Sequence, residues 1–129
     1  MSTNHRIMVV DDEPDLLRMV ELYLKAWHFK VDAFTQPAEA LEHFKKNPSA
    51  YSLVITDIRM PDMTGLELAR HVLHIKQDMK IMLMTAFQVD TIELESNMPI
   101  IRHQDILKKP FRLVEICTGV KKQLQIATP

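Results

Sequence analysis

The sequence predicts an α/β protein in which a five-stranded parallel sheet carries helices on both faces. Short apolar runs, typical of buried strands, alternate five times along the chain with stretches whose apolar residues recur at helical spacing. Most of these runs contain no polar residue, as expected for parallel strands that are buried on both faces. The alternation of strands with helices and the apolar character of the strands together favour a parallel sheet with helices on both faces.

The composition fits a single domain spanning residues 1–129. Hydrophobic residues make up 47% of the chain and charged residues 26%, which is ordinary for a globular domain. The 16 basic and 17 acidic residues are mixed along the chain, so we expect no nucleic-acid binding.

No apolar segment approaches the roughly 20 residues needed to cross a bilayer, and no signal peptide is apparent. With one cysteine and no disulfide framework, a cytoplasmic protein without membrane contact is expected.

Each predicted strand is a short apolar or alternating segment bounded by polar or turn-forming residues. The central run is too short for a helix, is rich in β-branched residues and is followed closely by Asp57. Segment 30–34 alternates between polar and apolar residues instead. The expected strands cover residues 7–10, 30–34, 53–55, 80–84 and 106–107.

The predicted helices start and stop at residues with known capping preferences. Pro14 and Pro37 occupy first helical turns, where a missing N–H is tolerated. Asp62 or Thr64 is placed to cap the third helix, and Asn47 with the proline that follows it ends the second. Amphipathic spacing then supports helices at about residues 14–27, 35–46, 64–75 and 113–126.

Charged or polar side chains follow four of the five predicted strands. They are Asp11 and Asp12 after the first strand, Asp57 after the third, Thr85 after the fourth and Lys109 after the fifth. Taken singly, each is more simply explained as a helix cap, a turn residue or a solvated side chain. Because the carboxyl ends of parallel strands meet at one edge of a sheet, the set together predicts a binding site.

Three converging carboxylates repel one another, and a hard divalent cation with oxygen ligands relieves that repulsion. Mg²⁺ is the natural candidate, because it keeps coordination positions for water and phosphate oxygens. Lys109 and Thr85 would complete a site for a phosphoryl group, with the Asp57 carboxylate as the nucleophile. With only two glycines, the chain has no glycine-rich phosphate-binding loop, which argues against nucleotide binding.

These residues resemble the receiver domain of two-component response regulators, the family of the chemotaxis response regulator. The resemblance covers nearly the whole chain and implies a flavodoxin-like sheet with strand order 2-1-3-4-5. The motifs that carry it are Val9-Val10-Asp11-Asp12-Glu13-Pro14, Asp57-Ile58-Arg59-Met60-Pro61-Asp62-Met63-Thr64-Gly65-Leu66-Glu67, Met84-Thr85-Ala86 and Lys109-Pro110-Phe111.

The resemblance also implies roles for the acidic residues. Asp57 would accept the phosphoryl group. Asp12 and Asp57, with the backbone carbonyl of Arg59, would hold Mg²⁺, and Asp11 would act through a metal-bound water.

It likewise implies that Thr85 bonds a phosphoryl oxygen and acts as the switch residue. Lys109 would pair with the phosphate, rather than Lys108, since the family places its lysine directly before proline. By analogy the Lys109-Pro110 bond should be cis, a state tolerated before proline.

The chain departs from the family pattern at two places. Ile106 stands where receivers usually carry Tyr or Phe, so we expect no aromatic ring flip to couple Thr85 to an output face. The glycine-alanine pair usual before the fifth strand is missing, and residues 87–104 show no clear periodicity. We therefore predict an irregular fourth helix region, with a helix that is short, displaced or mobile.

The expected function is that of a phosphoacceptor switch. A sensor histidine kinase or a phosphotransfer protein would supply the phosphoryl group, and an effector protein would bind the face formed by residues 87–117. We expect no enzymatic activity beyond self-phosphorylation and autodephosphorylation at Asp57. No output domain follows the last helix, so we expect a stand-alone receiver or a piece of a longer protein.

Two alternatives stay open. One is a phosphorylation-independent adaptor with the receiver fold, which Ile106 makes plausible and which the clustered carboxylates argue against. The other is a Mg²⁺-dependent phosphatase with an aspartyl nucleophile, similar to haloacid dehalogenase-like enzymes. Those enzymes place a second acid where Arg59 stands, and turnover of a phosphomonoester would distinguish them.

Overall fold

The computed structural model describes residues 4–86 and 106–125. The strands are β1 (Arg6–Val10), β2 (Lys30–Phe34), β3 (Leu53–Asp57), β4 (Ile81–Thr85) and β5 (Ile106–Lys108). The helices are α1 (Pro14–Ala26), α2 (Pro37–Lys46), α3 (Gly65–Ile75) and α5 (Leu113–Leu124), with one 3₁₀ turn, η1 (Pro48–Ala50), before β3. Strands and helices alternate from β1 to β4, as the periodicity predicts, and α5 follows β5.

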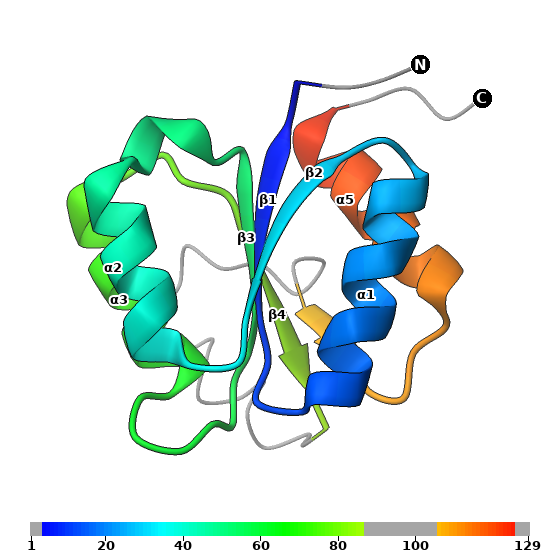
Figure 1. Cartoon of the computed structure of the whole chain (residues 1–129), viewed down its shortest axis with the longest axis horizontal. Coiled ribbons are helices and arrows are strands. Elements are labelled where there is room, and N and C mark those ends of the chain that lie inside the picture. Colours follow the sequence, from blue (N-terminus) through cyan, green and yellow to red (C-terminus); the bar gives the residue numbers. More distant parts are fainter. Residues whose placement is uncertain (1–3, 87–105, 126–129) are drawn as a thin grey trace.

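The described strands form one parallel sheet in the order β2-β1-β3-β4-β5. This result confirms the predicted fold class and strand order. Val10 pairs with Thr56, and Asp57 pairs with Met84, so the ends of neighbouring strands are level. Because all strands run in the same direction, the residues that follow them gather at one edge of the sheet (Figure 1).

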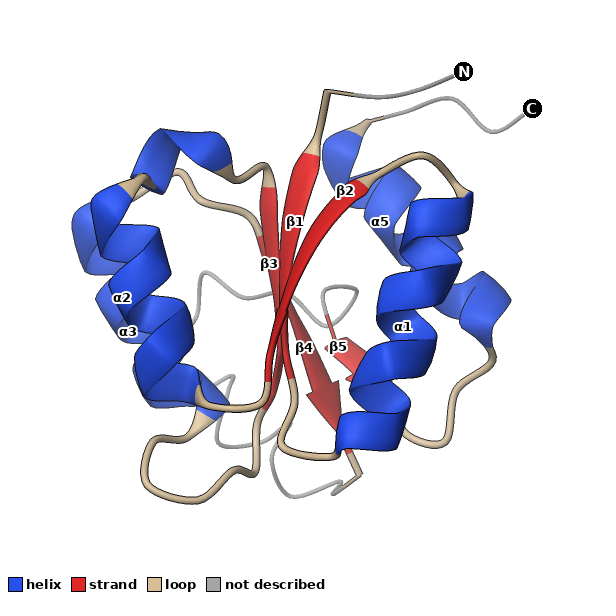
Figure 2. Cartoon of the chain, viewed as in Figure 1, coloured by secondary structure: helices blue, strands red, loops and turns tan. Residues whose placement is uncertain are grey.

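Two hydrophobic cores lie on opposite faces of this sheet. Figure 2 shows α2 and α3 on one face, and α1 and α5 on the other. Successive side chains of a strand point to opposite faces. In β1, Met8 and Val10 therefore pack in the core beneath α2 and α3, whereas Ile7 and Val9 pack in the core beneath α1 and α5. All four side chains are fully buried, so β1 and its neighbours form a rigid platform for the carboxyl edge.

The helix starts follow the capping rules. Pro14 and Pro37 are the first helical residues of α1 and α2. Thr64 caps α3: its Oγ1 accepts a hydrogen bond from the Glu67 amide at 3.2 Å, and Glu67 Oε1 accepts one from the Thr64 amide at 3.2 Å. Of the two predicted caps for α3, Thr64 is therefore the one in use.

Gly65 allows α3 to start close against the end of β3. A Cβ atom at this position would lie 2.0 Å from the Asp57 carbonyl oxygen, so only glycine fits. The Gly65 amide also donates a hydrogen bond to the Ile58 carbonyl oxygen at 2.8 Å. This contact ties the loop after β3 back to the strand end and fixes the backbone beside Asp57.

Some expectations concern residues that the structure does not describe. The prediction of a short, displaced or mobile fourth helix falls within residues 87–105, outside the described residues.

Ile106, at the start of β5, is partly buried and packs against the core beneath α2 and α3. Among the described helices, none has both the length and the apolar character that a membrane crossing requires.

Candidate functional site

Three carboxylates converge at the carboxyl edge of the sheet, as predicted. Asp11 and Asp12 directly follow β1, and Asp57 is the last residue of the neighbouring strand β3. One oxygen from each of the three carboxylates lies within 4.8 Å of the other two. Oxygen donors this close together could hold a metal ion, and an all-oxygen set suits a hard divalent cation. We call these three residues the carboxylate cluster.

Two members of the carboxylate cluster are buried, and burial changes their acidity. The side chain of Asp11 is fully buried, and Asp57 is only 5% exposed. Burial, followed by the charge of Asp11, raises the pKa of Asp57 to about 6, against the lowering effect of Lys109. Burial also raises the pKa of Asp11, against a hydrogen bond from the Glu13 amide. In both cases burial, which disfavours the charged form, outweighs the favourable contacts with Lys109.

Backbone amides fix the direction of both buried carboxylates. Asp57 Oδ1 accepts a hydrogen bond from the Ile58 amide at 3.0 Å, and Asp11 Oδ1 accepts one from the Glu13 amide at 2.9 Å. The second oxygen of each side chain, Oδ2, then faces the ammonium group of Lys109. Neither carboxylate is therefore free to turn away from the site.

Lys109 brings the positive charge to the site. Its Nζ atom lies 3.1 Å from Asp11 Oδ2, 3.3 Å from Asp57 Oδ2 and 3.5 Å from Glu13 Oε1. Burial works to lower the pKa of Lys109, but the surrounding carboxylates outweigh burial and raise it above its ordinary value. Lys109 is thus held as an ammonium ion, and one positive charge faces several carboxylates.

The backbone around Lys109 places its side chain toward the cluster. The Lys109 amide donates a hydrogen bond to the Thr85 carbonyl oxygen at 2.7 Å, which ties it to the end of β4. The Lys109-Pro110 peptide bond is cis, as expected from the family resemblance. Lys108, by contrast, is exposed. The choice of Lys109 over Lys108 as the residue that reaches the carboxylates therefore agrees with the structure.

The remaining predicted site residues lie at or near the same edge. Thr85 ends β4 and is only 2% exposed. Arg59 lies in the loop two residues after Asp57 and is exposed. A role for the Arg59 carbonyl as a metal ligand stays a prediction.

Sequence reasoning missed one member of the site, Glu13. It belongs to the acidic run after β1, and this run was the sequence feature that could have identified it.

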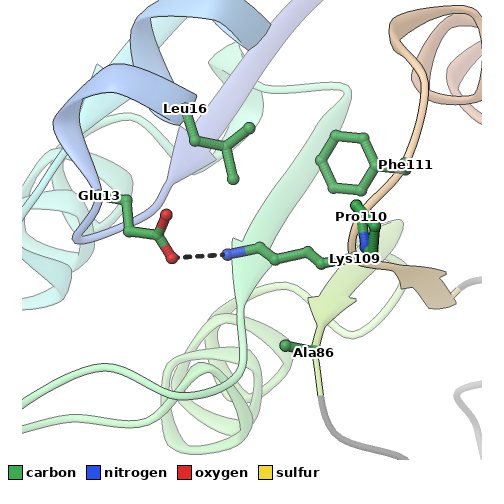
Figure 3. Close-up of a pocket in the computed structure, with 6 residues that line it drawn as sticks. All are labelled: Glu13, Leu16, Ala86, Lys109, Pro110 and Phe111. Carbon is green, nitrogen blue, oxygen red and sulfur yellow. Dashed lines mark hydrogen bonds and ion pairs between the residues drawn. The ribbon is translucent and has the colours of Figure 1, made fainter.

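A pocket of about 480 Å³ opens beside Glu13, with Lys109 and Glu13 facing each other across the pocket (Figure 3). Leu16, Ala86, Pro110 and Phe111 form the rest of its lining. The ammonium group can therefore be approached from outside the molecule.

The family model of the response regulator receiver domain matches residues 7–121. The response regulator receiver protein CpdR of Brucella abortus (strain 2308) is 35% identical over 119 residues, covering 92% of this chain and 96% of that protein. The two-component response regulator ARR2 of Arabidopsis thaliana is 32% identical over 112 residues, covering 85% of this chain and 16% of that protein. The chain therefore corresponds to a small part of the longer regulators that it matches.

Solved structures give the same fold. The crystal structure of a response regulator receiver protein from Sinorhizobium medicae WSM419 superposes with a TM-score of 0.82 at 31% identity, covering 94% of each chain.

Proposed function

The chain belongs to the response regulator receiver domain family, and from this premise we propose that it accepts a phosphoryl group on Asp57. The observation that carries the proposal is the geometry around Asp57. This carboxylate is nearly buried, has one oxygen 3.3 Å from the Lys109 ammonium and shares its surroundings with two further carboxylates. Such a site favours a ligand that combines a divalent cation with a phosphoryl group.

The donor would be the phosphohistidine of a sensor histidine kinase or of a phosphotransfer protein. An oxygen of the Asp57 carboxylate attacks the phosphorus atom, and the P–N bond of the phosphohistidine breaks. The imidazole nitrogen leaves with the bonding electron pair, and an acyl phosphate remains on Asp57. An ionised carboxylate needs no general base for this step.

The other site residues would stabilise the charge of the transferred group. The Lys109 ammonium pairs with a phosphoryl oxygen, and the Thr85 hydroxyl donates a hydrogen bond to another. Asp12 and Asp57, with the Arg59 carbonyl, would hold Mg²⁺, and Asp11 would contribute through a water. Mg²⁺ supplies neutralisation of the negative charge that three carboxylates and a phosphoryl group bring together.

The chemistry of the site residues fits a divalent cation. The donor set consists of oxygen atoms only. Burial and the charge of Asp11 raise the pKa of Asp57, and a bound cation would favour its ionised form.

Signalling would follow from a shift between two surface states. We expect the phosphorylated chain, a single domain over residues 1–129 acting in the cytoplasm, to bind an effector protein through the face formed by residues 87–117. Its chemistry would be confined to gaining and losing its own phosphoryl group. The names of two relatives, a response regulator receiver protein and a two-component response regulator, support the signalling role.

Incubation with acetyl phosphate and Mg²⁺, followed by intact-mass spectrometry, tests the proposal. We expect the mass to increase by one phosphoryl group in the wild-type protein and not in Asp57→Asn or in the presence of a chelator. Lys109→Gln should retain Mg²⁺ binding and lose most of the incorporation. No incorporation in the wild type, with the fold intact, would contradict the proposal. It would favour the phosphorylation-independent adaptor that Ile106 suggests.

A further inference from the structure

Three carboxylate oxygens compete for the ammonium group of Lys109 in the structure. A lysine ammonium carries three N–H groups. Three carboxylate oxygens surround its Nζ atom, from Asp11 at 3.1 Å, Asp57 at 3.3 Å and Glu13 at 3.5 Å. A phosphoryl oxygen on Asp57 can pair with Lys109 only if one of these contacts is given up.

Glu13 is the contact that can be given up. The side chains of Asp11 and Asp57 are 0% and 7% exposed, and each is held by a backbone amide. The Glu13 side chain is 63% exposed. Although Glu13 is the N-cap residue of α1, its side chain makes no capping hydrogen bond and reaches across the pocket to Lys109 instead (Figure 3).

We propose that Glu13 is a positioning residue that competes with the phosphoryl group for the Lys109 ammonium and thereby weakens phosphoryl binding at Asp57. The proposal rests on the proposed function and adds a residue that regulates the same site. Its basis is geometric: the longest of the three contacts to Lys109 is made by its most exposed partner. When a phosphoryl group arrives, Lys109 exchanges this contact for a phosphoryl oxygen, and Glu13 turns into solvent.

Neutralising Glu13 should strengthen phosphoryl binding by a modest factor. An exposed ion pair contributes about 0.2–1 kcal/mol, which corresponds to roughly 1.4-fold to fivefold in a binding constant. Glutamine keeps nearly the same shape and the same backbone amide, so the hydrogen bond to Asp11 is retained. A neutral amide oxygen, however, competes less well for an ammonium than a carboxylate does. We therefore expect an increase of about two- to fivefold in affinity for Glu13→Gln.

A simpler role for Glu13 is to stabilise α1, because a negative charge near a helix N-terminus is favourable. The two roles predict different results. Loss of a helix-terminal charge lowers the unfolding temperature and leaves the affinity of the site unchanged. Loss of competition raises the affinity, and the gain shrinks with salt because the Glu13 carboxylate is exposed to solvent.

Beryllofluoride, a phosphoryl mimic, measures the affinity directly when it is titrated at saturating Mg²⁺ and followed by amide NMR shifts. Glu42 provides the matched control, because its side chain is 64% exposed, lies on α2 and pairs with Lys45. Glu42→Gln removes the same charge at a similar exposure on the other face of the sheet. Separate Mg²⁺ titrations and thermal unfolding of each variant would show whether metal binding or stability has changed.

We expect Glu13→Gln to reach half-saturation at about two- to fivefold lower beryllofluoride concentration than wild type, and Glu42→Gln to match wild type. The difference should largely disappear in 1 M salt, where the Debye length is about 3 Å. Equal or weaker binding by Glu13→Gln, or a gain that persists in 1 M salt, would overturn the role of Glu13 while wild-type binding still supports the proposed function. A wild-type protein that binds no beryllofluoride would overturn both proposals.

Discussion

Two polar networks on the same sheet differ in how their charges are balanced. In the network around Asp32, Arg6 lies 2.9 Å from Asp32 Oδ1, and the Tyr51 hydroxyl donates to Asp32 Oδ2 at 2.7 Å. One carboxylate thus meets one guanidinium and one hydroxyl. At the carboxyl edge, by contrast, the carboxylate cluster and the nearby Glu13 share the ammonium of Lys109.

The difference supports the proposal that the Asp32 network stabilises the fold and that the carboxylate cluster binds a ligand. A carboxylate whose partners match its charge and its hydrogen-bonding capacity stabilises the structure. A buried carboxylate with an excess of negative neighbours costs stability until a cation or a proton arrives. Asp32 has partners that match its charge, whereas the carboxylate cluster shares one lysine, as we propose for a site that binds a cation.

Neutralising Asp57 should have the largest effect on stability, and it should be favourable. The pKa of Asp57 is raised from its ordinary value of 3.8 to about 6, so the fold prefers the neutral form. The metal-free protein therefore loses stability as pH rises from about 4 through about 6, and this loss persists above that window. Since one pKa unit corresponds to about 1.4 kcal/mol, Asp57→Asn should be more stable by about 3 kcal/mol at pH 8.

Urea unfolding of wild type and Asp57→Asn, at pH 4 and at pH 8 with a chelator present, measures this difference. The two proteins should have similar stability at pH 4 and diverge at pH 8. An Asp57→Asn variant that is less stable than wild type at pH 8 would show that the carboxylate cluster is compensated after all.

Neutralising Asp32 should have the opposite sign. Asp32→Asn removes the ion pair with Arg6 and weakens the acceptor for Tyr51, and both contacts are partly exposed. We expect a loss of about 1 kcal/mol in the free energy of unfolding, measured in urea under the same conditions. Mg²⁺-dependent beryllofluoride binding should be unchanged. Stabilisation by Asp32→Asn would remove the distinction between the two networks.

Removing the Tyr51 hydroxyl should have the smallest effect of the three. Tyr51→Phe deletes the donor to Asp32 Oδ2 but retains the stacked contact with Phe44 and the ion pair between Arg6 and Asp32. Water can replace the hydroxyl at the partly exposed Asp32, so we expect a loss of about 0.5 kcal/mol. Denaturant midpoints of this variant beside Asp32→Asn would rank the two contacts. A loss larger than that of Asp32→Asn would contradict the ranking.

The carboxyl edge was predictable from the sequence because simple rules place its residues. An apolar run that stops at an acid predicts both a buried strand and the position of that acid at the strand end. Asp11, Asp12 and Asp57 were expected to converge on this ground, and they do. Thr64 was one of the two residues predicted to cap α3, and the capping box that it forms with Glu67 makes it the one in use.

The Asp32 network was not predictable in the same way. Its members come from three separate segments, and nothing in the spacing of Arg6, Asp32 and Tyr51 reveals that the strand register brings them together. The contact from Glu13 to Lys109 joins residues 96 positions apart, and it depends on the side-chain direction at the start of α1. Contacts of this kind follow from packing, which periodicity and capping rules do not specify.

We infer that Asp57, rather than Asp11 or Asp12, is the phosphoacceptor at the carboxyl edge. Borohydride reduction of the acetyl phosphate-treated protein tests it most directly, because an aspartyl phosphate is reduced to homoserine and the converted residue is then located by peptide mass spectrometry. We predict conversion at residue 57 alone, dependent on Mg²⁺ and absent from untreated protein. Conversion at Asp11 or Asp12 in place of Asp57, or incorporation that survives in Asp57→Asn, would contradict the claim.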